Sequence, residues 1–488
     1  MSTPPNIVLV VMDTARFREV VALDRYIDRS AIHRLSDEGS TYTRTFTTAP
    51  WTLPSHASLF TGTYPSKHGA HADHKHLDES LETVAETFAA NGYETVGVSN
   101  NTWISEEFGF RRGFDTFHKT WQYIQTDTDL GEVARTTNGL EMFPALARRL
   151  IEGNPVVNIA NAVYGRFLRK RRDDGARRTN EWVERWLGER HDRPFFLFIN
   201  YLEPHLEYRP PKSIATQFLP EEISYAEAMD ISQNAWEYIA GRTDHSEQQF
   251  EALRALYFAE IAYLNRRIGD LRESLVDADE WDDTIFVLTS DHGENIGEHD
   301  LMDHQYCLYD TLLHVPLIIA GGSFDGGGEI DELVQTTDIP PTLLDAAGID
   351  ADEVRSQFQG RSFHPDAETS ARKHVISEYM APQPSMDALD EQLDGLTSTA
   401  RQYDRSLRAI RTEQYKLIRG SDGSMELYDI VDDPNESVDV ASDRSDRSRH
   451  LEKELDQWLD SFEHANASGA VSMSERTKSR LEELGYIQ

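Results

Sequence analysis

Residues 6–13 read NIVLVVMD, six apolar residues in succession followed by the carboxylate of Asp13. A run this short that is apolar on both faces is typical of a strand in a parallel sheet that helices cover on each side. In such sheets, ligands bind beyond the carboxyl ends of the strands. The stretch therefore predicts a buried strand that places Asp13 at the functional edge of an α/β sheet.

Four further apolar runs repeat this pattern, at residues 95–98, 195–199, 285–289 and 315–319. Helical patterns lie between them: 248–271 carries apolar residues at three-to-four spacing, and 81–91 is a shorter helix that ends at Gly92. Alternating strands and helices predict an α/β fold with an open, mostly parallel central sheet.

The last part of the chain follows a different pattern, with short strands expected at 374–378, 406–412, 415–419 and 425–430 and a helix at about 446–464. This order is typical of a small α+β subdomain with an antiparallel sheet. We therefore expect a catalytic domain over 1–370 and a C-terminal subdomain over 371–488. Residues 121–190 are polar and helical, and we expect them to form an insertion near the site mouth or a surface helix pair.

The composition is strongly acidic, with 85 Asp and Glu residues against 48 Lys and Arg and a net charge of −37. Acidic residues are spread along the whole chain, which argues against a nucleic-acid partner because such a protein needs a basic face. Self-repulsion at this charge is relieved by salt, and lysine supplies only 9 of the 48 basic residues. We infer a halophilic, archaeal source; an ordinary acidic mesophilic protein is the alternative.

Cys307 is the single cysteine, which excludes a disulfide framework and a cysteine metal cluster. The first residues carry no basic segment followed by an apolar one, so no secretory signal is expected. The longest apolar runs, 7–12 and 195–199, are far shorter than the roughly 20 residues of a membrane helix. We therefore expect no transmembrane segment and a cytoplasmic location.

Two strand ends carry groups that bind metals. Asp13 follows the first buried run, and Asp291 with His292 follows the run at 285–289. Two carboxylates and an imidazole suit a divalent cation of hard or borderline character. Acidic residues after strands also serve as caps and turn formers, so the prediction depends on the three residues lying together.

A candidate nucleophile lies at the start of a short helix in TLPSHASLFTG, residues 52–62. Pro54 is compatible with a first helical turn, which places Thr52 at the helix N-terminus. The free amides and the dipole there favour an anion, and a metal ion on the same oxygen would favour ionisation further. Thr52 as a mere cap is the alternative, and Ser55, its nearest rival, would lie one turn inside the helix.

Two histidines follow predicted strands and could complete the chemistry. His205 comes after the run at 195–199, and His304 comes after Asp291. Either could donate to an oxyanion or protonate a leaving group, although an ordinary surface or core histidine is the simpler interpretation.

Over nearly its full length, the chain resembles the sulfatase family of the alkaline-phosphatase superfamily. Its acidic composition is that of a haloarchaeal-type member. The matching segments are NIVLVVMD at 6–13, TLPSHASLFTG at 52–62, YP at 64–65, HG at 68–69, TSDHGE at 289–294, DIPPTLL at 338–344, ELYD at 426–429 and DPNE at 433–436. The resemblance implies an alkaline-phosphatase-like sandwich and a metal site made by Asp13, Thr52, Asp291 and His292. It implies one divalent ion, Mn²⁺, Mg²⁺ or Ca²⁺, with Zn²⁺ possible because of the imidazole; only Glu203 and His205 lie near where a second would need ligands.

The departures from the family pattern bear on the reaction. Thr52 stands where sulfatases convert Cys or Ser into formylglycine, and a secondary alcohol cannot give that aldehyde. The remaining departures are His56 for an arginine, Thr14 for a second acid, residues 99–101 for a lysine-containing segment, and His304 where a substrate lysine often lies. The expected catalytic residues are therefore Thr52, His56, His205 and His304.

These departures favour a phosphoester substrate. Sulfated threonine lacks the carbonyl-forming exit of formylglycine, whereas phosphothreonine can be cleaved by water, as in superfamily phosphodiesterases with a threonine nucleophile. We expect hydrolysis of phosphate mono- or diesters of a small molecule or glycan. The alternatives are a sulfatase acting without formylglycine, a transferase that moves a phospho-substituent onto a glycan or lipid head group, and a catalytically silent binding protein.

Overall fold

The structure, a computed structural model, describes residues 4–120, 175–190 and 193–465. Its centre is a nine-stranded, mostly parallel sheet. In spatial order the strands are β11 (Gly328–Gln335), β2 (Ser40–Phe46), β10 (Leu317–Ala320), β6 (Thr284–Ser290), β1 (Asn6–Met12), β5 (Phe195–Tyr201), β3 (Glu94–Ser99) and β4 (Thr116–Lys119), with the short β9 (His314–Val315) paired to β2. The α/β fold with a mostly parallel sheet, predicted from the sequence, is confirmed.

β1 occupies the middle of this sheet and is buried along its whole length. It pairs in parallel with β5 on one side and with β6 on the other. Because successive side chains of a strand point to opposite faces, Ile7, Leu9 and Val11 enter one apolar core while Val8, Val10 and Met12 enter the other. The continuous apolar run is thus explained by helices on both faces.

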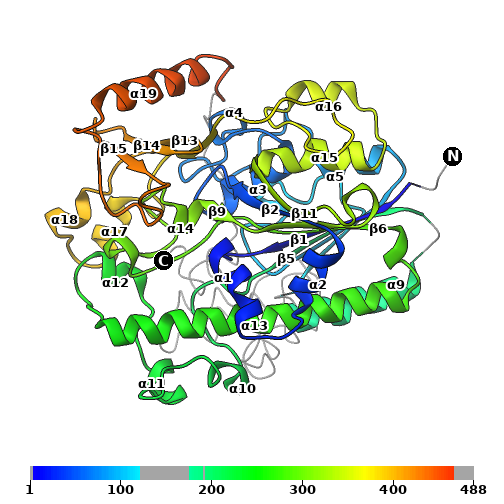
Figure 1. The fold of residues 1–488 in the computed structure, drawn as a ribbon, viewed down its shortest axis with the longest axis horizontal. Helices are drawn as coiled ribbons and strands as arrows, with labels where there is room; N and C mark the ends of the chain where they lie inside the picture. The colour runs from blue at the N-terminus through cyan, green and yellow to red at the C-terminus, as the bar shows by residue number, and fades with distance from the viewer. Residues whose placement is uncertain (1–3, 121–174, 191–192, 466–488) are drawn as a thin grey trace, which may run out of the picture.

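Helices cover the sheet on both sides (Figure 1). The long α13 (Glu247–Asp277) packs with α9 (Ala176–Glu189) and α2 (Ala31–Glu38) over one face. The other face carries α3 (Thr52–Thr61), α5 (Val84–Ala90) and α15 (Ile339–Ala346). The shorter helices are α1 (Phe17–Ala22), α4 (Pro65–His68), α10 (Lys212–Ala215), α11 (Tyr225–Met229), α12 (Ala235–Ile239), α14 (Asp310–Leu313), α16 (Asp352–Gln357), α17 (Met386–Gln392) and α18 (Ser398–Arg401).

Several predicted elements have different bounds in the structure, and a physical reason is clear for two of them. The run at 315–319 is divided at Pro316, which cannot donate to a ladder, and β10 pairs antiparallel with both β6 and β2. The helix expected at 81–91 begins only at Val84, because Thr83 caps it by accepting a hydrogen bond from the Glu86 amide.

The C-terminal part forms a second sheet, in the order β12 (Val375–Tyr379), β13 (Leu407–Arg411), β14 (Tyr415–Gly420) and β15 (Met425–Asp429). All three pairings are antiparallel, and α19 (Ser445–Leu459) packs against this sheet. The predicted antiparallel strands are confirmed, and the domain division at residue 370 stays a prediction. Most of the expected insertion, residues 121–174, lies outside the described residues.

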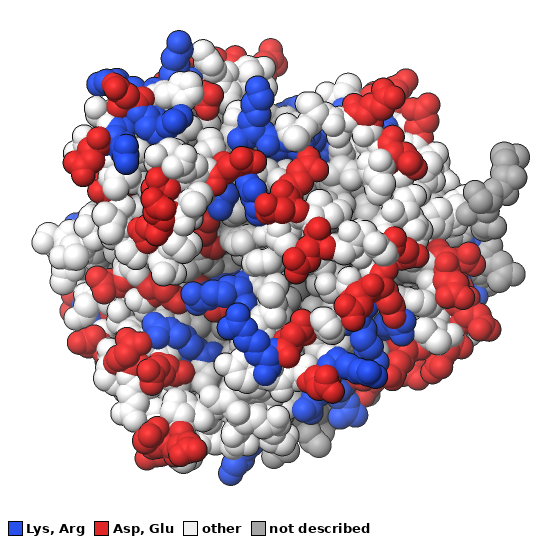
Figure 2. All heavy atoms as spheres, viewed as in Figure 1, with Lys and Arg blue, Asp and Glu red and all other residues white. Residues whose placement is uncertain are grey.

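Figure 2 shows acidic side chains dispersed over one face of the molecule, with basic side chains between them. This face therefore presents no extended basic patch of the kind that a nucleic-acid backbone requires. Among the described residues, no helix combines the length and the apolar character needed to cross a membrane.

A buried ion cluster anchors the second sheet to the main body. Lys416, on β14, is fully buried, and its Nζ lies 2.7 Å from Asp310 Oδ1 and 2.7 Å from Glu436 Oε1. Asp310 begins α14, and its other oxygen lies 3.2 Å from Arg411 Nε on β13. The Lys416 ammonium therefore joins β14 to two carboxylates from separate segments, and Arg411 ties β13 to one of them.

We expect Lys416→Met to lower the free energy of unfolding by about 3–5 kcal/mol, because it leaves two buried carboxylates without their shared cation. Urea unfolding followed by tryptophan fluorescence measures the change. Lys453→Met, on the exposed side of α19, is the matched control and should change stability by less than about 0.5 kcal/mol. A loss at Lys416 no larger than that of the control would contradict this account of the junction.

Candidate active site

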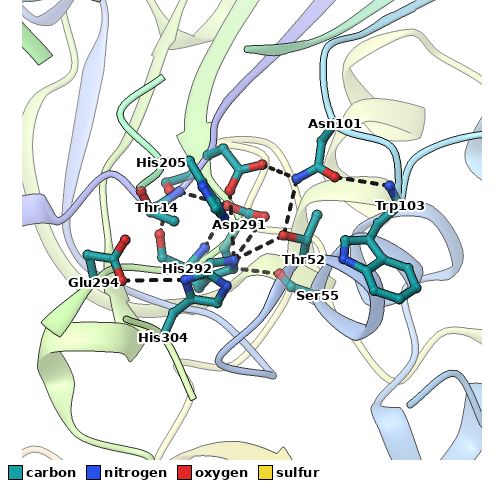
Figure 3. Close-up of polar contacts among 12 residues, drawn as sticks. Thr14, Thr52, Ser55, Asn101, Trp103, His205, Asp291, His292, Glu294 and His304 are labelled. Atoms are coloured by element: carbon teal, nitrogen blue, oxygen red, sulfur yellow. Dashed lines mark hydrogen bonds and ion pairs between the residues drawn. The ribbon is translucent and has the colours of Figure 1, made fainter. Parts of the chain in front are cut away.

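The register of the central strands brings Asp13 and Asp291 together. Met12 of β1 pairs with Ser290 of β6, so the next residue of each strand lies at the same edge of the sheet. Ser290 Oγ strengthens this junction by donating to Met12 O at 2.5 Å. The two carboxylates and His292 consequently converge beyond the strand ends (Figure 3).

Four candidate ligand atoms meet at this edge. His292 Nε2 lies 3.3 Å from Asp291 Oδ2, 3.3 Å from Thr52 Oγ1 and 3.9 Å from Asp13 Oδ1. His292 Nδ1 donates to Gly293 O at 2.9 Å, which leaves the lone pair of Nε2 facing the carboxylates. The buried oxygens Asp13 Oδ1 and Asp291 Oδ2 have no hydrogen-bond partner among the described residues. This donor set fits a divalent cation.

Backbone donors orient the Asp291 carboxylate. Its Oδ1 accepts hydrogen bonds from the amides of His292 at 2.9 Å and Thr14 at 3.3 Å, which turns Oδ2 toward the cluster. Thr14 stands where the family carries a second acid, and it contributes this amide from a backbone with φ of 63°. The residue thus orients a ligand through its main chain.

The pKa values of the buried ligand groups are shifted away from their usual values. Burial raises the pKa of Asp13 to about 7, although a hydrogen bond from Asn101 opposes this change. Burial, and then the charge of Asp13, raise the pKa of Asp291 well above its usual value. Burial also holds the pKa of His292 well below its usual value. A bound cation would stabilise the charged carboxylates and neutral imidazole that ligation requires.

Thr52 is the first residue of α3, after Trp51 in an extended conformation. Its side chain is fully buried, and Oγ1 faces both His292 Nε2 and Asn101 Nδ2, the latter at 3.5 Å. The rival Ser55 is occupied elsewhere, because its Oγ donates to Asp291 O at 2.6 Å. The arrangement therefore favours Thr52 as the nucleophile.

His56 lies one turn into α3 and is fully buried. Its Nδ1 donates to Thr52 O at 2.9 Å and lies 3.4 Å from Asp291 Oδ2, while its ring packs edge-on against Phe110 and Phe198. Burial lowers the pKa of His56 to about 4, so the ring is neutral near pH 7. This geometry suits a residue that positions the Thr52 turn, and direct participation in the reaction stays a prediction.

His205 and His304 join the same cluster. The ring centroid of His304 lies 4.5 Å from that of His292 and 5.1 Å from that of His205. Burial alone would lower the pKa of His304, but the negative charges of Asp303 and Glu294 raise it well above its usual value. The structure thus brings every residue of the predicted site together, although the role of each one stays a prediction.

Asn101 is a site residue that the sequence did not identify. Its Nδ2 donates to Asp13 Oδ2 at 2.6 Å and also reaches Thr52 Oγ1, while its Oδ1 accepts from the Trp103 amide at 3.0 Å. The Trp103 contact fixes which end of the amide faces the site. Asn101 follows β3 by two residues, at the same sheet edge as Asp13, and this placement is the signal that could have identified it.

Comparisons with known proteins match most of the chain. The sulfatase family model matches residues 5–349. Arylsulfatase K of Xenopus laevis is 23% identical over 484 residues, which cover 93% of this chain and 82% of the relative. The human arylsulfatase K is 24% identical over 471 residues, covering 90% of this chain and 79% of the relative.

Two solved structures illustrate the shared fold. The phosphonate monoester hydrolase of Agrobacterium radiobacter superposes with a TM-score of 0.65 at 21% identity, covering 93% of this chain and 95% of its own. BT4656, in complex with its substrate D-glucosamine-2-N,6-O-disulfate, superposes with a TM-score of 0.67 at 17% identity, covering 94% of this chain and 99% of its own.

We expect Asn101→Ala to weaken Mn²⁺ binding about 10–100-fold, because it removes the donor that orients the Asp13 carboxylate. Isothermal titration of the chelator-treated protein measures the affinity. Asn100→Ala is the matched control, since the Asn100 side chain contacts Thr120 and Thr179 instead of the ligands. Equal affinities in the wild type and Asn101→Ala would show that this amide does not support the metal site.

Proposed function

The chain belongs to the sulfatase family of ester hydrolases, and from that premise we propose that it cleaves phosphate mono- or diesters through Thr52. The observation that carries the proposal is the placement of the Thr52 hydroxyl. Thr52 begins the buried helix α3, and its Oγ1 lies 3.3 Å from His292 Nε2, among the candidate metal ligands. A threonine in this position cannot supply the formylglycine aldehyde of a sulfatase.

The two ester chemistries differ in how the enzyme is released. A formylglycine hydrate expels sulfate by re-forming a carbonyl, and a threonine ester has no such exit. In the proposed reaction, Thr52 Oγ1 forms a bond to phosphorus while the bond from phosphorus to the substrate alcohol breaks. Water then attacks the phosphothreonine, restores the hydroxyl and releases the phosphate product.

The described residues divide the remaining tasks. A bound Mn²⁺, Mg²⁺ or Ca²⁺, with Zn²⁺ as a further candidate, would supply the positive charge that favours ionisation of the nucleophile. Asp13, Asp291 and His292 would hold this ion with Thr52. The positive end of the α3 dipole would also favour the oxyanion. His304, whose ring neighbours that of His292, and His205, whose ring neighbours that of His304, would donate a proton to the departing alcohol oxygen.

The known relatives include both kinds of chemistry. A phosphonate monoester hydrolase and a protein in complex with a disulfated glucosamine share the fold. These likenesses support an ester of a small molecule or glycan as the substrate. A sulfate ester is the second candidate, because arylsulfatase K matches 93% of this chain.

We expect the wild type to hydrolyse 4-nitrophenyl phosphate or bis(4-nitrophenyl) phosphate in molar salt with Mn²⁺. Thr52→Ala should lower kcat/KM at least about a thousandfold, because it removes the nucleophile. Thr52→Ser keeps a hydroxyl at the same position and should retain most of the activity. Nitrophenolate release measures all three proteins.

Ser55→Ala serves as the control for the helix start, since it removes the hydrogen bond to Asp291 O and leaves Thr52 in place. We expect a loss there of about tenfold or less. Full activity of Thr52→Ala would exclude the threonine nucleophile. Turnover of 4-nitrophenyl sulfate alone would establish the sulfate ester as the substrate instead.

A further inference from the structure

A second group of metal-binding side chains lies beside the first. Glu294, Asp303 and His304 each offer a ligand atom, and these three atoms lie within 4.8 Å of one another. Glu294 follows β6, while Asp303 belongs to β8 (Met302–Asp303), which pairs with β7 (Asn295–Ile296). The β7–β8 pairing thus brings Asp303 and His304 close to Glu294. Figure 3 shows Glu294 and His304 near His292, a residue of the first group.

The spacing of these atoms is compatible with ligation. His304 Nδ1 lies 2.5 Å from Asp303 Oδ1 and 3.4 Å from Glu294 Oε1. Ligands held about 2.1 Å from one cation stand about 3 Å apart, so small adjustments of these side chains would complete a coordination shell.

Within the described residues, the His304 ring is the one ion-pair partner of the two carboxylates in this group. Glu294 is fully buried and Asp303 is 6% exposed, and within the described part of the chain neither carboxylate forms an ion pair with a lysine or arginine. Glu294 Oε2 is buried and has no hydrogen-bond partner among the described residues. A buried carboxylate oxygen in this state is costly unless a proton or a cation meets it.

We propose that Glu294, Asp303 and His304 bind a second divalent cation, which makes the active site a two-metal centre. Two carboxylates with one imidazole favour Mn²⁺ over softer ions. The site adjoins the first one, because the His304 and His292 ring centroids are 4.5 Å apart. The sequence analysis expected a single ion, with only Glu203 and His205 near where a second would need ligands, and Glu203 Oε1 accepts a hydrogen bond from the Ala176 amide at the start of α9.

A second cation also accounts for a departure from the family pattern. His304 stands where a family lysine often lies, and without a metal ion the charge at this position depends on the proton that Asp303 and Glu294 hold on the ring. A cation held by His304 and its two carboxylates would place positive charge here, and His205 would then be the proton donor to the departing alcohol oxygen. This inference holds whichever ester the enzyme cleaves.

Metal stoichiometry tests the proposal directly. The full-length protein is stripped with a chelator, dialysed to equilibrium against millimolar Mn²⁺ in molar salt, and analysed for manganese per chain by mass spectrometry. We expect close to two ions in the wild type, and close to one in both Glu294→Gln and Asp291→Asn, which each remove one group. Glu378→Gln, a buried carboxylate of β12 outside both groups, should keep two.

Electron paramagnetic resonance gives a second readout that needs no variant to fold. Two adjacent Mn²⁺ ions should give a broadened, spin-coupled spectrum in the wild type, whereas one isolated ion gives resolved hyperfine lines. One manganese per chain, with the spectrum of an isolated ion, would overturn the proposal. In that case a protonated His304 would be the partner of the two carboxylates. Two ions in a protein that turns over no phosphoester would uphold the second site and reject the proposed function.

Discussion

The parallel pairing of β1 with β6 is the constraint on which the active site depends. This pairing fixes where both strands end, and it therefore sets Asp13 beside Asp291. The register is held firmly because β1 contributes alternate side chains to two separate apolar cores. A slip of one residue would exchange the two faces of the strand and move Asp13 away from its partner. The hydrophobic effect that folds the sheet thus also assembles the ligand set.

Burying several carboxylates at the strand ends destabilises the folded protein unless cations pair with them. Asp13, Asp291, Glu294 and Asp303 lie close together, and the described residues around them supply imidazoles, amides and hydroxyls but few fixed positive charges. Elsewhere buried carboxylates are neutralised by the chain itself, as Lys416 does for Asp310 and Glu436. The contrast between the two places indicates that the strand-end carboxylates are adapted to cations from solution.

The sequence predicted the site residues whose positions depend on neighbouring residues alone. Asp13 and Asp291 directly follow strands and Thr52 begins a helix, and each of these elements can be recognised from its own residues. Asn101 was missed because its contact with Asp13 depends on β3 lying two strands from β1, which no local pattern shows. Glu294 was missed for a similar reason, since the β7–β8 pairing brings it to Asp303 and His304. Pro316 was counted within a strand because an apolar run conceals the missing donor.

The number of cations bears on which ester the site can stabilise. A phosphate monoester carries two negative charges near neutral pH, whereas a phosphodiester or a sulfate ester carries one. Residues 99–101 replace a lysine-containing segment and His304 stands where a family lysine often lies, so a single cation would leave a dianionic group with less compensating charge near Thr52 and would suit a monoanionic ester. A second cation at His304 would double the positive charge that faces the transferred group. If Glu294, Asp303 and His304 hold this cation, the residues that the β7–β8 pairing brings together would link the metal content of the site to the charge of its substrate.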